Sequence, residues 1–241
     1  MSEEVKAAFG GYMSAYYHSL VPRTKSMQEY IARGLATSIV WAPSRMVDLA
    51  EEMLASWQRN DTDGTATHPA KMPVILVAMA KDYTPTGRDY ARQIADEVEI
   101  IFPDDEKERC FKVDVSLGDI RAQVAFCAHD EPTARELARQ FAKYVDKTNS
   151  RRFEAIYKFA GINHAFPVQI ESPEIISVST QTDSKNLTIL ACDLTLRAAI
   201  PTFYAPGDDD PNDGKGTDGD PNDPSGYQVV TQVNNEEMEV L

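Results

Sequence analysis

Apolar residues recur at steps of three and four along residues 1–60, which is the spacing of one helix face. Pro22 and Pro43 interrupt the pattern, so the region predicts three helices. Ser26 with Glu29 matches a capping box for the second helix, and Ser44 is placed to cap the third. The three apolar faces are Val5, Phe9, Tyr12, Tyr16 and Leu20; Met27, Ile31, Leu35 and Ile39; and Met46, Leu49, Ala50, Met53, Leu54 and Trp57.

A polar connector at residues 61–71 separates this helical region from a segment with a different pattern. Val74–Met79 is a continuous apolar run, which predicts a strand that is covered on both faces. Thr86 and Asp89 match a helix start. The apolar face expected for that helix comprises Tyr90, Ile94, Val98 and Ile101.

Apolar and polar residues alternate on both sides of Leu117-Gly118-Asp119, which predicts a β-hairpin across residues 111–126. Asp130 and Pro132 then open another helix. The longest strand is expected at residues 187–200, where period-two alternation is sustained until Pro201 stops it. Shorter strands are expected at Arg152–Phe159, Phe166–Glu171 and residues 176–180.

These elements predict an α+β fold with a mixed, mostly antiparallel sheet and helices on one face. An N-terminal helical region (residues 1–60) precedes the core domain (residues 72–206), and an extended acidic C-terminal arm follows it. Whether the first three helices form a domain of their own is left open by the pattern.

The arm divides into two parts. Residues 207–226 consist mainly of Asp, Asn, Gly and Pro without an apolar side chain, which is typical of a solvated linker. Residues 227–241 contain a short β-prone stretch and form a tip. We expect this tip to add a strand to a neighbouring subunit or to lie in a groove of it. The expected contact residues are Tyr227, Val229, Val230 and Val233.

Charge is distributed unevenly along the chain. The net charge is −14, and residues 207–241 hold −9 of it, from seven Asp, three Glu and one Lys. Nucleic-acid binding normally relies on basic patches, so direct, sequence-specific DNA or RNA binding is disfavoured. The longest apolar run, residues 73–80, is too short for a membrane span, and no signal-peptide pattern is present. We therefore expect a protein that is made in a reducing cytoplasm.

Catalytic signatures are missing from the sequence, so we expect no enzyme activity and no cofactor. It contains no phosphate-binding glycine loop and no nucleophile elbow. Cys110, Cys127 and Cys192 are too widely spaced for a metal motif, which favours their burial as small apolar side chains. His129 beside Asp130 could act as a general base, but Asp130 is also placed to cap the next helix, and we favour the cap.

An Asp-Pro-Asn-Asp core occurs twice in the linker, ten residues apart. Oxygen-rich segments of this kind suit calcium, although neither copy has the glycine and glutamate of an EF-hand loop. We favour a solvated linker and expect no metal site. The candidate ligands, should calcium bind, are Asp208, Asp210, Asn212, Asp218, Asp220 and Asn222.

One resemblance concerns the order of elements from Met72 to Tyr204. The strand–helix–hairpin–helix–strands order resembles the tail-terminator and neck proteins of contractile-tailed bacteriophages. Pro173-Glu-Ile-Ile176 followed by residues 186–201 looks like the closing hairpin of such modules. The similarity rests on pattern and covers a little over half of the chain.

The resemblance implies a virion subunit that forms a homo-oligomeric ring at the head–tail junction. Its expected partners are further copies of itself and the tail tube, sheath or connector proteins. Two alternatives remain open: another virion component, such as a baseplate or adaptor protein, and a small-ligand-binding or enzymatic α+β domain.

Overall fold

The computed structural model describes residues 3–42, 72–81, 84–85, 98–101, 109–147, 149–180, 182 and 186–206. Its helices are α1 (Glu3–His18), α2 (Lys25–Ala32) and α4 (Glu131–Val145), with a 3-10 turn at Leu35–Thr37. Its strands are β1 (Ile39–Trp41), β2 (Val74–Met79), β3 (Thr84–Pro85), β4 (Val98–Ile101), β5 (Cys110–Ala128), β6 (Arg152–Phe159), β7 (Ile162–Ile170), β8 (Ser177–Thr180) and β9 (Thr188–Tyr204).

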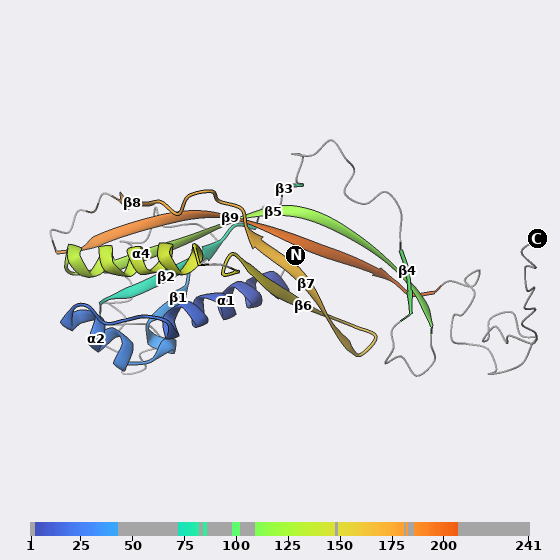
Figure 1. Ribbon diagram of the computed structural model, residues 1–241, viewed down its shortest axis with the longest axis horizontal. Coiled ribbons are helices and arrows are strands. Elements are labelled where there is room, and N and C mark those ends of the chain that lie inside the picture. Colours follow the sequence, from blue (N-terminus) through green and yellow to red (C-terminus); the bar gives the residue numbers. More distant parts are fainter. Residues whose placement is uncertain are drawn as a thin grey trace, which may run out of the picture. The chain divides into compact units, whose positions relative to one another are not determined.

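The described strands form one mixed sheet in the order β1-β2-β5-β9-β7-β6 (Figure 1). β3 and β4 also pair with β5, and β8 pairs with β9. β1 runs parallel to β2, whereas the pairs β2–β5, β3–β5, β4–β5, β7–β9 and β8–β9 are antiparallel. The prediction of an α+β fold with a mixed, mostly antiparallel sheet is confirmed.

The chain divides into two compact units. The first comprises residues 1–90, 117–157 and 164–200, and the second comprises residues 91–116, 158–163 and 201–241. Their described parts are treated separately below.

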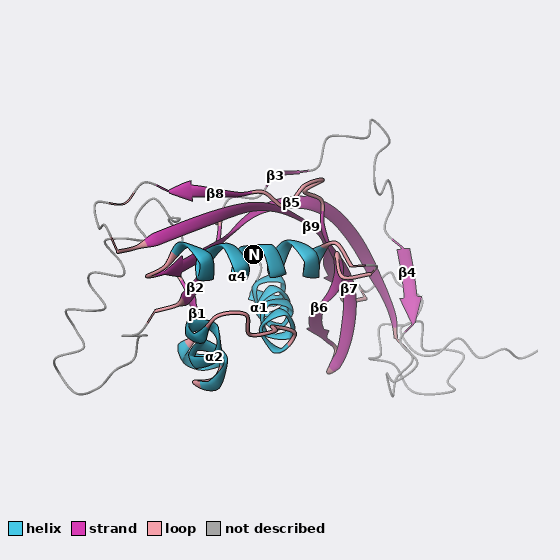
Figure 2. Cartoon of the chain, turned by 60° about the vertical axis from the view of Figure 1, so that its left-hand side comes forward, coloured by secondary structure: helices cyan, strands magenta, loops and turns pink. Residues whose placement is uncertain are grey.

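In the first unit, α1, α2 and α4 lie on the same face of the sheet (Figure 2). The predicted face of α1 is buried: Val5, Phe9 and Tyr16 are fully enclosed. Tyr16 meets Phe141 of α4 edge-on with ring centroids 5.1 Å apart, and Phe141 lies 5.6 Å from Phe126 of β5. Aromatic rings therefore join both helices to the sheet.

The opposite face of the first unit carries a smaller apolar cluster, made of Val74, Leu76, Ala125, Cys127 and Ile189. Ile75 and Val77 of β2 point instead into the main core beneath the helices. Both faces of β2 are thus buried, as the continuous apolar run predicted.

The second helix differs from its prediction at both ends. Its N-cap is Thr24, whose side chain accepts a hydrogen bond from the Met27 amide, and not Ser26. The helix ends at Ala32, and Gly34 adopts a φ of 91°, a conformation that favours glycine. Ile39 was wrongly placed on the helix face, because the chain enters β1 there and pairs in parallel with β2.

The predicted hairpin at residues 111–126 is also wrong. Gly118 and Asp119 lie inside the continuous strand β5, where they pair with Pro85 and Thr84. A Gly-Asp pair favours a turn, but extended backbone is equally open to glycine, and pairing with β3 supports it here.

Two further strand predictions need correction. Pro201 does not stop the last strand, since β9 continues to Tyr204, and the fixed φ of proline fits extended backbone. Val98 and Ile101 were expected on a helix face but belong to β4, which pairs with β5.

Other predictions concern residues outside the described ranges: the helix at 46–57 with Ser44, the connector, the helix start at Thr86, and the whole arm.

Candidate assembly interface

The histidine and carboxylate considered as a catalytic pair contact different groups. Asp130 is the N-cap of α4, where Oδ1 accepts a hydrogen bond of 2.9 Å from the Thr133 amide. Nδ1 of His129 lies 3.1 Å from the Asn186 carbonyl oxygen. The predicted cap is confirmed. Within the described ranges, no group of three or more His, Cys, Asp or Glu side chains could hold a metal ion.

The cysteines are free thiols within the fold. Cys127 and Cys192 are buried, and Cys110 is half-buried. Burial raises the pKa of Cys127 to about 12 and that of Cys192 to about 11. Both thiols therefore stay protonated at neutral pH and pack as small apolar side chains.

Two sets of predicted site residues lie outside the described residues. These are the contact candidates Tyr227, Val229, Val230 and Val233, and the calcium candidates between residues 208 and 222. Their roles stay predictions. In the described part of the chain, no helix has the length and hydrophobicity of a membrane span.

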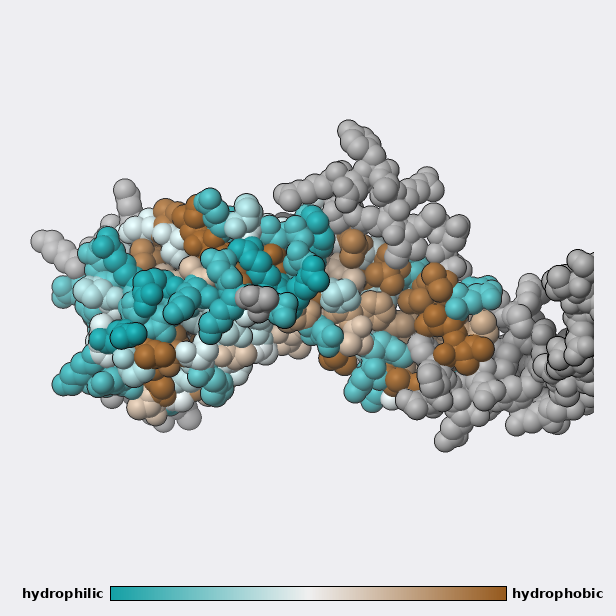
Figure 3. Space-filling model, in the orientation of Figure 1, coloured by the Kyte–Doolittle hydropathy of each residue, from teal (hydrophilic) through white to brown (hydrophobic). Residues whose placement is uncertain are grey.

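In the first unit, exposed apolar side chains mark the strand β8. Ile176 is 58% exposed and Val178 is 63% exposed. The two residues are two positions apart, so they share one side of this extended segment. Among the described strands β8 pairs only with β9, so its outer edge has no partner strand within the described residues. Figure 3 shows hydrophobic surface gathered over this element.

In the second unit, β4 also combines exposed apolar side chains with an edge that has no described partner strand. Val98 is 55% exposed and Ile101 is 60% exposed, while β5 is the single described partner of the strand. Hydrophobic surface is visible over β4 in Figure 3. An open edge with apolar side chains is a template for pairing with another chain.

Aromatic stacking supports β4 within the second unit. The rings of Phe159 and Phe203 stack with centroids 4.5 Å apart, and Phe111 meets Phe159 edge-on at 5.2 Å. The Arg109 guanidinium lies 5.0 Å from the centroid of Phe111. Strands β5, β6 and β9 each contribute one ring. The cluster therefore holds β5 in place, and β5 is the strand with which β4 pairs.

Ion pairs connect β5 and β9 in the first unit. Nε of Arg197 lies 3.0 Å from Oδ1 of Asp119, and its Nη1 lies 3.4 Å from Oε1 of Glu171. Nearby, Asp193 accepts hydrogen bonds from Arg121 at 3.1 Å and from Gln123 at 3.0 Å. These contacts favour one register between the two long strands.

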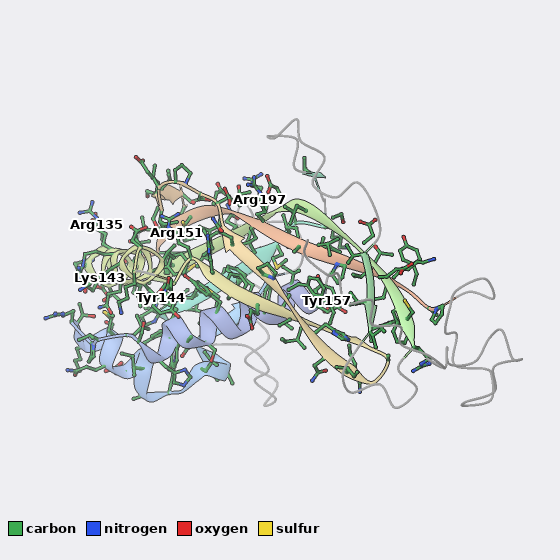
Figure 4. All side chains as sticks on the ribbon, turned by 45° about the vertical axis from the view of Figure 1, so that its right-hand side comes forward. Arg135, Lys143, Tyr144, Arg151, Tyr157 and Arg197 are labelled. Carbon is green, nitrogen blue, oxygen red and sulfur yellow. The ribbon has the colours of Figure 1, made fainter. Side chains whose placement is uncertain are left out.

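A pocket of about 140 Å³ lies between the α1–α2 loop and the C-terminal half of α4. Four cationic residues line it, Arg23, Arg139, Lys143 and Lys147, and we call it the basic pocket. Figure 4 shows Lys143 and Tyr144 on α4. The volume is below the roughly 300 Å³ at which small-molecule sites begin, so the pocket suits one or two side chains.

Nothing in the sequence pattern marked β8 or β4 as open edges, because a strand reads the same whether or not a neighbour covers it. The basic pocket was missed because Arg23 lies far from α4 in sequence. The spacing of four between Arg139, Lys143 and Lys147 was the available signal.

Comparison with known proteins gives no assignment: no protein-family model matches this chain, and no curated protein matches it.

Proposed function

We propose that this chain is a structural subunit of a tailed bacteriophage virion, a tail-terminator or neck ring component at the head–tail junction. The observation that carries the proposal is the pair of open strand edges, β8 and β4, each with exposed apolar side chains.

Open apolar edges are costly for a protein that remains alone in water. Natural proteins usually protect an edge with lysines, a proline, a bulge or a covering segment. Val178 and Val98 instead present β-branched side chains to solvent. Contact with a neighbour would remove that apolar surface from water, at about 25 cal/mol for each Å².

Ring assembly makes use of two different surfaces on one subunit. In a cyclic ring each copy offers one surface to the next copy and a second surface to the preceding one. The units containing β8 and β4 supply two such surfaces. The ion pairs of β5 and β9 and the phenylalanine cluster support a rigid frame for each of them.

The position at the head–tail junction rests on the resemblance of residues 72–204 to tail-terminator and neck proteins. The antiparallel pair β8–β9 supplies the closing pair of that pattern, with Ser177–Thr180 opposite residues 189–192. The central hairpin of the pattern is replaced by the single strand β5, and Val98 and Ile101 of its first helix lie in β4, so the resemblance rests on the remaining elements. The proposed partners are further copies of the chain and the tail tube, sheath or connector.

The test compares oligomeric state and location. Mass photometry and negative-stain electron microscopy of the purified full chain should show closed rings, alone or on addition of a tail or connector protein. Val178→Glu should reduce assembly, whereas Ser179→Glu, an exposed neighbour on the opposite side of β8, should have a smaller effect.

Gold labelling of this chain on tailed particles should place it between head and tail. Labelling at the baseplate would support the alternative virion position. A chain that is monomeric at every concentration and binds no tail or connector component would overturn the proposal.

A further inference from the structure

We propose that the basic pocket binds the acidic segment 207–226 of a neighbouring copy of this chain. The inference rests on the proposed ring-forming function and names a contact between subunits. The carrying observation is a convergence of four cationic side chains in a protein whose net charge is −14.

Side-chain hydrogen bonds position the walls of the pocket. The Gln140 amide accepts a hydrogen bond from the Val21 backbone N–H at 2.9 Å and donates to the Val21 carbonyl at 2.8 Å. Nε2 of Gln140, which makes the second of these bonds, also donates to Oε1 of Glu136 at 2.8 Å. The loop that carries Arg23 is therefore fixed against α4, and the cations from the two elements stay together.

Glu136 compensates part of the positive charge in the pocket, since it also interacts electrostatically with Arg23, whereas Lys143 and Lys147 have no acidic partner among the described residues. Arg139 forms an ion pair with Glu136 at 2.6 Å. No ion pair joins Arg23, Lys143 or Lys147 to a carboxylate in the described part of the chain. Lys147 is exposed, and its ammonium group lies 5.9 Å from the centroid of the Tyr144 ring.

The helix dipole accounts for only part of this arrangement. Cations near the C-terminus of α4 interact favourably with its dipole, which suffices as a reason for Lys143. Arg23 comes from a different element, and Lys147 lies beyond the last helical residue, Val145. Their convergence on one pocket points to an anionic ligand.

The acidic segment matches the pocket in charge. Residues 207–226 hold seven Asp and one Lys, a balance of −6. Each of the two Asp-Pro-Asn-Asp cores has carboxylates at both ends, Asp210 and Asp213 in the first and Asp220 and Asp223 in the second.

The segment also matches the pocket in length. Arg139 and Lys147 are eight residues apart, about 12 Å along a helix axis. The end carboxylates of one core, such as Asp210 and Asp213, are three residues apart, about 10 Å in extended chain, and the long side chains of arginine and lysine span the small difference. One core can therefore reach cations at both ends of the pocket.

A neighbouring copy can deliver the segment. The second core ends at Asp223, 17 residues after Pro206, so it can lie at most about 56 Å from Pro206, which exceeds the diameter of a small domain. Within a ring, attachment to the adjacent subunit keeps the segment at a high effective concentration, so a modest affinity suffices. Nucleic acid, the other polyanion, is disfavoured because the whole chain would repel it at long range.

The first experiment detects the contact in the unmodified full chain. Copies labelled with ¹⁴N and ¹⁵N are mixed under assembling conditions, treated with a zero-length carbodiimide, and analysed by mass spectrometry. We expect isotopically mixed cross-links between Lys143 or Lys147 and aspartates of residues 208–223. Cross-links found only within single copies, or none to these lysines, would overturn the proposal.

The second experiment exchanges the charges. The pocket variant carries Lys143→Glu and Lys147→Glu, and the segment variant carries Asp210→Lys, Asp213→Lys, Asp220→Lys and Asp223→Lys. Each variant alone should assemble about tenfold more weakly, and an equimolar mixture should recover assembly, because each pocket then meets a segment of opposite charge in its neighbour.

Lys81→Glu combined with Lys158→Glu is the matched control, because it changes the net charge equally at two exposed lysines outside the pocket. An equal loss of assembly in this control would show that net charge alone causes the effect, which would overturn the pocket assignment. Failure of the mixture to recover would overturn contact between copies. Binding of a single-stranded oligonucleotide that the pocket variant loses, without cross-links, would assign the pocket to nucleic acid instead.

The outcomes separate this inference from the proposed function. Rings that form equally well with the pocket variant would refute the pocket contact while leaving the ring proposal in place. Mixed cross-links between copies that never close into rings would support the contact and refute the ring.

Discussion

Tyr12 and Tyr16 lie one turn apart on the buried face of α1 and differ in what their hydroxyl groups contact. The Tyr16 hydroxyl donates a hydrogen bond of 2.8 Å to the Leu137 carbonyl of α4. The Tyr12 hydroxyl is buried and has no hydrogen-bond partner in the described part of the chain. Burial raises the pKa of both phenols, so both stay neutral.

This difference predicts opposite responses to the same substitution. Tyr16→Phe should lower the free energy of unfolding by about 1 kcal/mol, because it removes a buried donor from a carbonyl. Tyr12→Phe should be neutral or slightly stabilising, because it removes a buried hydroxyl without a partner. Urea denaturation of both variants measures this, and equal losses would contradict the assignment of these two contacts.

Glu136 should make stability depend on acid pH. The hydrogen bond from Arg139 holds the pKa of its carboxyl at about 2, below the ordinary 4.5, despite an opposing effect of burial. Since the folded-state pKa is the lower one, the stabilisation is fully present above about pH 4.5 and is lost as pH falls towards 2.

The measurement is an NMR titration of the Glu136 side chain together with denaturation at pH 6 and pH 3, roughly either side of the ordinary carboxyl pKa. Arg139→Ala should raise the pKa towards its ordinary value. Glu136→Gln should reduce the loss of stability on acidification. An unchanged pKa in Arg139→Ala would show that the ion pair is not its cause.

At the scale of elements, β5 and β9 are joined by two arginine–aspartate pairs in opposite directions. Arg197 and Asp119 have side chains that are 21% and 19% exposed, whereas Arg121 and Asp193 are 62% and 56% exposed. Removing one partner of a shielded pair leaves the other charge without a partner, whereas exposed pairs contribute little to stability.

Arg197→Ala should therefore cost about 1–3 kcal/mol, and Arg121→Ala less than about 1 kcal/mol. Both variants remove an arginine from the same strand pair, so each is the control of the other. Denaturant midpoints measure the difference, and a larger loss in Arg121→Ala would contradict the role given to burial.

At the scale of the whole molecule, the two parts of the arm should behave differently. Truncation after residue 226 removes the tip with Tyr227 and Val233 and should weaken assembly, because the tip is the β-prone part. Truncation after residue 206 also removes the acidic segment and should weaken it further, since the charge contact with the basic pocket is lost. Sedimentation at several concentrations measures both effects.

Salt separates these two contributions. The extra loss on removing residues 207–226 should shrink in high salt, because charge contacts near the surface are screened. The loss due to the tip should persist, because apolar burial and strand pairing are not screened in this way. Truncation after residue 206 without any change in assembly would refute both roles of the arm.

The sequence by itself determined the elements whose signals are local. The face of α1, the cap at Asp130, the two-sided burial of β2 and the strand Arg152–Phe159 follow from period and capping chemistry, which neighbouring residues decide. The mixed, mostly antiparallel character of the sheet followed from their order.

Tertiary structure decided the rest, because the competing local states are close in energy. Gly118 and Asp119 are compatible with a turn or a strand. Pairing with β3 and the ion pair between Asp119 and Arg197 stabilise the strand. Ile39 accepts a helix or a strand, and β2 selects the strand. Two further features depend on contacts between residues distant in sequence, which no local pattern encodes. They are the described edges of β8 and β4 without a partner strand, and the position of Arg23 beside α4 in the basic pocket.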